Sequence, residues 1–277
     1  MNNFFRIFSA ICFLLLAGCF QVDTLVRVNP DGSGTVVETM MLSKKMLAQM
    51  SEMMQGFAGE GGEKPRPVDL FEPGKLKARA AEMGDGVSFL SAKRAETPEY
   101  SGYTASYAFK DINKLKLSQQ KEGTSGTLAV DKTPSTPVFF HFRKGEPARL
   151  TIEIPKSGTA DKASDEKKEG APSQTTDKGT LTDEDAKKLA DAFLSMKMAL
   201  AVEVNGTIVE TNATYRNGNR ITVVNFDLSK LASPSPAQLE KLKKLNMTSL
   251  DDAKELLKAF PGMKMDMNDR LTVVFTK

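Results

Sequence analysis

Residues 156–179 contain no large apolar side chain, and this polar stretch divides the chain into two parts. Lys, Asp, Glu, Ser, Thr and Gly dominate the stretch, and its apolar residues are three alanines. Such a segment cannot bury enough surface to offset the entropy lost on ordering. We therefore predict a disordered insertion over 156–180. It separates an N-terminal region, 24–155, from a C-terminal region, 181–277, and we expect the two regions to pack together as one domain.

Apolar patterns on either side of this insertion predict blocks of strands and blocks of helices. Period-two alternation, typical of half-buried strands, recurs within residues 87–109 and 138–154. Helical spacing of apolar residues predicts helices over 43–57 and 75–83. Other segments predict strands at 24–29, 35–40, 198–205, 207–215, 220–228 and 271–276, and helices from Thr182, Ser235 and Ser249. Because the two types are segregated, we predict an α+β fold with a largely antiparallel sheet.

The N-terminus has the pattern of an export signal. Arg6 precedes an apolar run over residues 7–16, which is too short to span a bilayer because spanning takes ~20 apolar residues. The next residues complete the sequence Leu16-Ala17-Gly18-Cys19, which resembles a bacterial lipobox. The resemblance implies a signal peptide over 1–18, cleavage between Gly18 and Cys19, and acylation of Cys19, with palmitate among the acyl groups. A secretory signal or membrane anchor with a chance cysteine is the alternative.

Acylation of Cys19 would place the folded body close to a membrane. Residues 19–23 would form a short tether, and several buried acyl chains hold a protein on a bilayer without a spanning helix. The other cysteine, Cys12, would be removed with the signal, so the mature chain could form no internal disulfide. Phe20 stands where enterobacterial lipoproteins retained in the inner membrane carry Asp. We therefore expect an envelope lipoprotein that faces the periplasm, with the outer membrane favoured.

Charge and motif content argue against several function classes. A formal net charge of +3 over 277 residues gives no basic surface for nucleic acid. The single histidine, His141, lies in a strand-like segment with no carboxylate nearby in sequence, so a structural role is expected. No nucleophile, phosphate-loop, dinucleotide or metal-ligand motif is present. We expect a protein that is not an enzyme and has no cofactor; an unrecognised hydrolase is an alternative.

Methionine is abundant, with 14 residues in the chain, and it clusters in two places. The first cluster has helical spacing and predicts an apolar face for a lipid or a protein partner; it comprises Met46, Met50, Met53, Met54 and Phe57. The second cluster alternates with polar residues, as Met263, Met265 and Met267. Thioethers are soft ligands that suit Cu(I), so a copper-handling lipoprotein is an alternative function. Core packing is the other interpretation of both clusters.

Residues 16–57 resemble the start of LppM-like bacterial lipoproteins. The shared features are the lipobox, a very short tether, and the segment Val-Arg-Val-Asn-Pro-Asp-Gly-Ser-Gly-Thr-Val opening a hairpin that is followed by a helix. The resemblance implies a mixed α/β fold, an envelope location and a lipidic ligand. We therefore expect a non-enzymatic lipoprotein, anchored to the membrane through Cys19, that serves as a binding or scaffold module for lipid or an envelope partner.

Overall fold

The computed structural model describes residues 20–57, 68–117, 138–154, 196–227 and 263–277, without the side chains of 52–57. Several predictions fall outside these residues. They are the signal peptide with Gly18 and Cys19, the insertion at 156–180, and the helices expected from Thr182, Ser235 and Ser249.

Strands make up most of the described elements, together with two α-helices. In chain order the elements are β1 (Phe20–Val28), β2 (Gly34–Ser43), α2 (Lys44–Phe57), α3 (Pro73–Glu82), β3 (Val87–Glu96), β4 (Tyr100–Phe109), the 3-10 turn η2 (Ile112–Lys114), β5 (Lys116–Leu117), β6 (Val138–Arg143), β7 (Ala148–Glu153), β8 (Met196–Val204), β9 (Thr207–Thr211), β10 (Arg216–Asn217), β11 (Arg220–Asp227), β12 (Lys264–Met265) and β13 (Arg270–Thr276).

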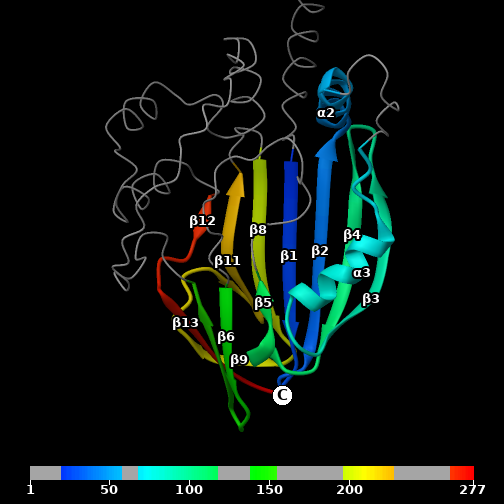
Figure 1. Ribbon diagram of the computed structural model, residues 1–277. Coiled ribbons are helices and arrows are strands. Elements are labelled where there is room, and N and C mark those ends of the chain that lie inside the picture. Colours follow the sequence, from blue (N-terminus) through cyan, green and yellow to red (C-terminus); the bar gives the residue numbers. More distant parts are fainter. Residues whose placement is uncertain (1–19, 58–67, 118–137, 155–195, 228–262) are drawn as a thin grey trace, which may run out of the picture.

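These strands form two sheets (Figure 1). Sheet A has the order β10-β11-β8-β1-β2-β4-β3, with β12 also paired to β11, and sheet B has the order β5-β6-β7-β13-β9. Apart from the parallel pair β1–β8, the described pairs are antiparallel. The predicted α+β class with largely antiparallel sheets is confirmed.

The N-terminal hairpin shows how local sequence sets the register. A turn cluster follows β1, and within it Gly32 adopts a positive φ of 89° that disfavours side chains other than glycine. The Asp31 carboxylate accepts hydrogen bonds from the backbone N and the hydroxyl of Ser33, which fixes the turn. Val26 then lies opposite Val36, and both are fully buried. The predicted hairpin is confirmed, and it buries an apolar pair next to the turn end of its inner face.

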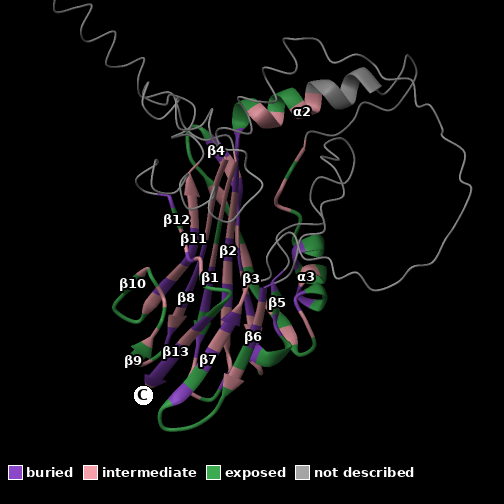
Figure 2. Ribbon diagram, turned by 90° about the vertical axis from the view of Figure 1, so that its left-hand side faces the viewer, coloured by how far each residue is buried: buried purple, intermediate pink, exposed green. Residues whose placement is uncertain are grey.

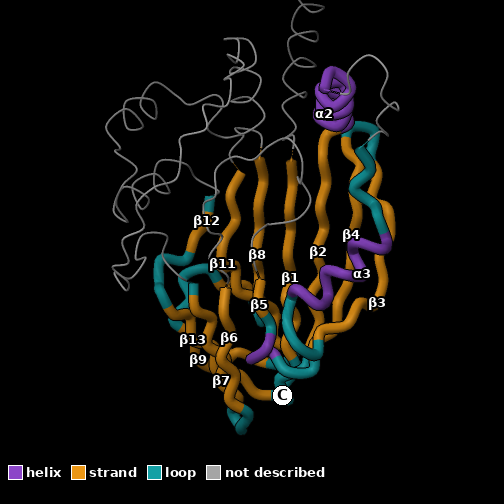
Figure 3. Tube along the Cα trace, in the orientation of Figure 1, coloured by secondary structure: helices purple, strands orange, loops and turns teal. Residues whose placement is uncertain are grey.

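We call one face of sheet A the inner face. Sheet B covers part of this face, and the core lies between the two sheets. Sheet B covers the inner face at the end away from α2, and α3 covers the β2–β4–β3 side (Figures 1 and 3). Both sheets and α3 contribute buried residues to one cluster, including Val202, Phe140, Phe275 and Leu76. Figure 2 shows buried residues along the strands of both sheets.

The chain departs from the predicted organisation at two places. Residues 20–23, expected as part of a tether, belong to β1, because each of them pairs with both β2 and β8. The strand expected over 207–215 is shorter than predicted: β9 ends at Thr211 and pairs with β13 in sheet B, whereas β10, at Arg216–Asn217, pairs with β11 in sheet A. Between these strands, the Thr214 backbone N donates to the Asp266 carboxylate at 2.6 Å, which holds the crossing segment. The predicted turn at Gly218 is present, with φ 60°.

Gly34 in β2 and Gly74 in α3 provide a matched pair of substitutions. A methyl group on Gly34 would overlap the carbonyl oxygen of Arg27, whereas one on Gly74 meets nothing within 4 Å. We expect Gly34→Ala to lower the free energy of unfolding by about 2 kcal/mol, because the β1–β2 ladder must shift. Gly74→Ala should raise it by up to ~1 kcal/mol, because alanine restricts the unfolded chain. Urea unfolding measures both values, and an unaffected Gly34→Ala variant would contradict the β1–β2 register.

Candidate functional site

Helix α2 begins beside the first residue of β1. Phe20 pairs with Leu42 in the β1–β2 ladder, and α2 follows β2 directly at Lys44. Ser43 caps the helix as predicted, because its hydroxyl oxygen accepts a hydrogen bond from the Met46 backbone N at 3.2 Å. Figure 2 shows the start of the helix turning sideways from the end of the strands. The chain therefore enters the fold at the end of sheet A that carries α2.

The first turns of α2 have a polar side and an apolar side. Lys44 and Lys45 are exposed, whereas Met46 and Met50 are half-buried. These two methionines are four residues apart and share a helix face, as predicted. Met53, Met54 and Phe57 also belong to α2, but their side chains are outside the described set. The structure thus places two residues of the predicted apolar face together, and it leaves them partly open to solvent.

Towards the α2 end, the inner face of sheet A carries apolar side chains on β11, β8, β1 and β2. Residues two apart in a strand share a face, and the register aligns such residues across β11, β8, β1 and β2. Six half-buried members form what we call the inner strip: Phe20, Val22, Met40, Met196, Met198 and Phe226. No local pattern in the sequence indicated this strip, because its members come from four strands and from both regions of the chain.

A buried ionic cluster holds α3 against the inner face. Glu38 of β2 is 5% exposed, and its carboxylate accepts hydrogen bonds from the Arg79 guanidinium at 2.7 Å and the Tyr103 hydroxyl at 2.8 Å. The Tyr107 hydroxyl donates to the Leu76 carbonyl oxygen at 3.1 Å, which joins β4 to α3 directly. Alternation along β2 turns Glu38 inward between Val36 and Met40. That alternation was visible in the sequence, but the partner of Glu38 was not.

Burial and the Glu38 charge together keep the two tyrosines of this cluster protonated. Burial raises the pKa of Tyr103, and the neighbouring Glu38 carboxylate raises it further. The same two causes raise the pKa of Tyr107 to about 12. Burial would lower the pKa of Arg79, but the attraction of Glu38 outweighs it and raises that pKa. Both tyrosines therefore keep their hydroxyl protons near neutral pH. Because these contacts join β2 and β4 to α3, we call the cluster an ionic clamp on α3.

His141 gains a partner that the sequence did not indicate. Its Nε2 lies 3.1 Å from a carboxylate oxygen of Glu153 on β7, and the Arg270 guanidinium lies 3.1 Å from the other carboxylate oxygen. No carboxylate is close to His141 in the sequence, but the fold brings the Glu153 carboxylate next to it. The hydrogen bond from Arg270, and then that from His141, lowers the pKa of Glu153. The three side chains lie at the surface of sheet B on neighbouring strands, and their hydrogen bonds fit a cross-strand ion pair.

The second methionine cluster lies beside β11. Met263 is 4% exposed, and Met265 is half-buried against the core opposite Val224. Asp266 lies between Met265 and Met267 in the sequence. Its carboxylate accepts hydrogen bonds from backbone N–H groups and from a side-chain amide. Among the described residues, no group of His, Cys, Asp and Glu could hold a metal ion. Packing accounts for Met263 and Met265, and copper binding by the three thioethers remains a prediction.

Comparisons with known proteins give one distant structural neighbour. No protein-family model matches the chain, and no curated protein matches it. The folded domain of the Mycobacterium tuberculosis LppM protein, solved by NMR, is 11% identical to this chain, with a TM-score of 0.30. The match covers 76% of this chain and 84% of that domain. A TM-score of this size does not establish a shared fold.

Among the described residues, no helix has both the length and the apolar character needed to cross a membrane.

Removing the negative charge of Glu38 tests the clamp. Glu38→Gln would leave the Arg79 guanidinium largely buried without a counter-charge. Because that guanidinium keeps 24% exposure, we expect a loss of about 2–3 kcal/mol in the free energy of unfolding, below the range for a fully buried pair. Glu210→Gln in β9 is the control, because Glu210 is exposed and should change stability by less than about 0.5 kcal/mol. Equal losses would contradict the clamp.

The raised tyrosine pKa values predict a loss of stability in alkali. In the unfolded chain these tyrosines ionise near pH 10, whereas in the fold they keep their protons to higher pH. The unfolded state then binds fewer protons, so the free energy of unfolding should be unaffected below pH 10 and fall as the pH rises towards 12. Urea unfolding between pH 8 and 12 measures the slope. Tyr107→Phe should make it shallower, and an identical slope would exclude Tyr107 as its source.

Proposed function

We propose that the protein is a non-enzymatic lipoprotein of the bacterial envelope, anchored through acylated Cys19, that engages lipid at the α2 end of sheet A. One observation carries the proposal: β1 begins at Phe20, directly after Cys19, and α2 starts beside that residue. An acyl group on Cys19 would therefore be attached to a paired strand with almost no slack. The α2 end must then lie against the bilayer.

The chemistry of α2 fits that position. Lys44 and Lys45 are exposed at its start and would meet anionic head groups, and each basic residue near such a surface contributes about 1 kcal/mol. Met46 and Met50 retain exposed apolar surface that acyl chains can cover. The start of the helix turns sideways from the end of the strands (Figure 2), so this part of α2 would run along the bilayer surface.

The inner strip supports lipid over other partners. Two of its members, Met40 and Phe226, pack against the core, and all six apolar side chains are half-buried. An acyl chain entering from the bilayer would meet this surface first. Phe20 in place of Asp further supports the outer membrane, with the body in the periplasm. No contact among the described residues favours the copper or hydrolase alternatives.

Membrane fractionation and vesicle binding test this proposal. Wild-type protein should be processed and recovered with the outer membrane, whereas Cys19→Ala should remain unprocessed because the acylation site is missing. For vesicle binding, the mature unacylated chain is mixed with phosphatidylglycerol vesicles. Lys44→Glu/Lys45→Glu should weaken its binding by tenfold or more, because two attractive charges become repulsive.

A charge-matched control separates the effect of position from the effect of net charge. Lys116→Glu/Lys144→Glu makes the same charge change at two exposed lysines on sheet B and its turn, outside α2. We expect this control to bind vesicles nearly as wild type does. Normal processing of Cys19→Ala would overturn the anchor, and equal weakening in both double variants would overturn the role of α2.

A further inference from the structure

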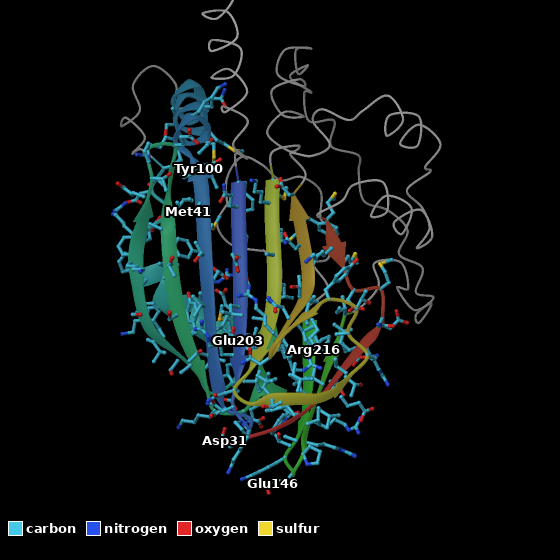
Figure 4. All side chains as sticks on the ribbon, turned by 180° about the vertical axis from the view of Figure 1, so that it is seen from behind. Asp31, Met41, Tyr100, Glu146, Glu203 and Arg216 are labelled. Atoms are coloured by element: carbon cyan, nitrogen blue, oxygen red, sulfur yellow. The ribbon has the colours of Figure 1, made fainter. Side chains whose placement is uncertain are left out.

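A polar hollow lies on the outer face of sheet A, at the end opposite α2. It has a volume of about 290 Å³, and its polar lining is Arg27, Asn29, Thr35, Glu203, Asn205 and Asn219. Figure 4 looks at this outer face and shows Met41 and Tyr100 near the α2 end, with Glu203 and Asp31 toward the other end. The lining comes from β1, β2, β8 and the turns that follow β1, β8 and β10.

Hydrogen bonds within the protein fix the three asparagine side chains. The Asn219 amide donates to the Val204 carbonyl oxygen at 2.8 Å, and the Asn205 amide donates to the Asn29 side-chain oxygen at 3.2 Å. The Asn29 amide in turn donates to the Ser33 hydroxyl at 2.9 Å. Their orientation is therefore set before any ligand arrives, which lowers the entropic cost of binding.

Arg27 and Glu203 supply opposite charges side by side. They are neighbours on the parallel strands β1 and β8, and Arg27 Nε donates to Glu203 Oε1 at 3.2 Å. The side chains are 51% and 29% exposed, so a ligand can reach both. Within the described part of the chain, both Nη atoms of Arg27, Oε2 of Glu203 and the side-chain oxygens of Asn205 and Asn219 make no hydrogen bond. The hollow thus offers donors next to acceptors, with no net charge.

We propose that this hollow binds a neutral polyhydroxylated ligand, namely a glycan chain. A hydroxyl group both donates and accepts, so neighbouring sugar hydroxyls can pair with guanidinium donors and with carboxylate or amide acceptors at once. A phosphate or metal ion would gain little, because Arg27 and Glu203 offset each other. Glu203 is the one carboxylate in the lining, so the pair of carboxyl groups that glycoside hydrolysis uses is missing there. The site is one of binding.

This inference goes beyond the proposed function, and it does not depend on Cys19. If the α2 end lies against a bilayer, the length of β1 places the hollow about 20 Å or more away from it. The hollow would then face the space beyond the membrane, where a glycan could reach it.

Calorimetric titration of the purified full-length protein in detergent tests the proposal. The probes are chitotetraose, maltotetraose and inorganic phosphate, which distinguish amino-sugar chains, plain hexose chains and anions. We expect saturable binding of at least one tetrasaccharide and none of phosphate. Glu203→Gln and Asn205→Ala should each raise its Kd about tenfold, because the first replaces a charged acceptor with a weaker neutral amide and the second removes an amide group that the ligand contacts.

Two controls keep the outcome decisive. Arg149→Gln changes an exposed arginine of sheet B and should leave the Kd unchanged. Glu203→Gln keeps the side-chain shape and removes an exposed ion pair, so it preserves the fold even if Asn205→Ala does not. The proposal is overturned if neither tetrasaccharide binds at millimolar concentration, if phosphate competes with the tetrasaccharide, or if Glu203→Gln leaves the Kd as it was.

Discussion

The parallel pairing of β1 with β8 determines most of the architecture. It joins a strand of the N-terminal region to a strand of the C-terminal region, and Val26 lies beside Val202 in the centre of sheet A. A shift of one residue would turn every inward side chain outward. The pairing therefore sets the buried face that sheet B and α3 cover. It also aligns Arg27 with Glu203 on the opposite face.

The two ends of sheet A differ in chemistry because different elements cover them. Sheet B seals the inner face away from α2, where the buried side chains are almost all apolar. Towards α2 the same face carries the half-buried inner strip and, beneath α3, the Glu38–Arg79 pair. A buried ion pair of this kind contributes little net stability compared with an apolar contact, but loss of either partner is costly. It therefore fixes where α3 sits more than it strengthens the fold.

Local patterns predicted many elements correctly because neighbouring residues decide them. The alternation in β4, the cap at Ser43 and the turn at Gly218 each follow from a few consecutive residues. Local patterns did not indicate where the chain passes from one sheet to the other. The segment after β9 leaves sheet B for sheet A, and the Asp266 carboxylate that holds it is 52 residues away in sequence. The inner strip was not predicted either, because it depends on the pairing of strands that are distant in the sequence.

The sequence by itself determined the α+β class, the N-terminal hairpin, the amphipathic start of α2 and the expected lipobox that ends just before β1. These depend on periodicity and short motifs, which are properties of contiguous residues. The tertiary structure alone decided which polar groups meet. Glu38 and Arg79 are 41 residues apart, and Arg27 and Glu203 are 176 apart. Contacts over such separations depend on sheet order and register, and no short stretch of sequence encodes either.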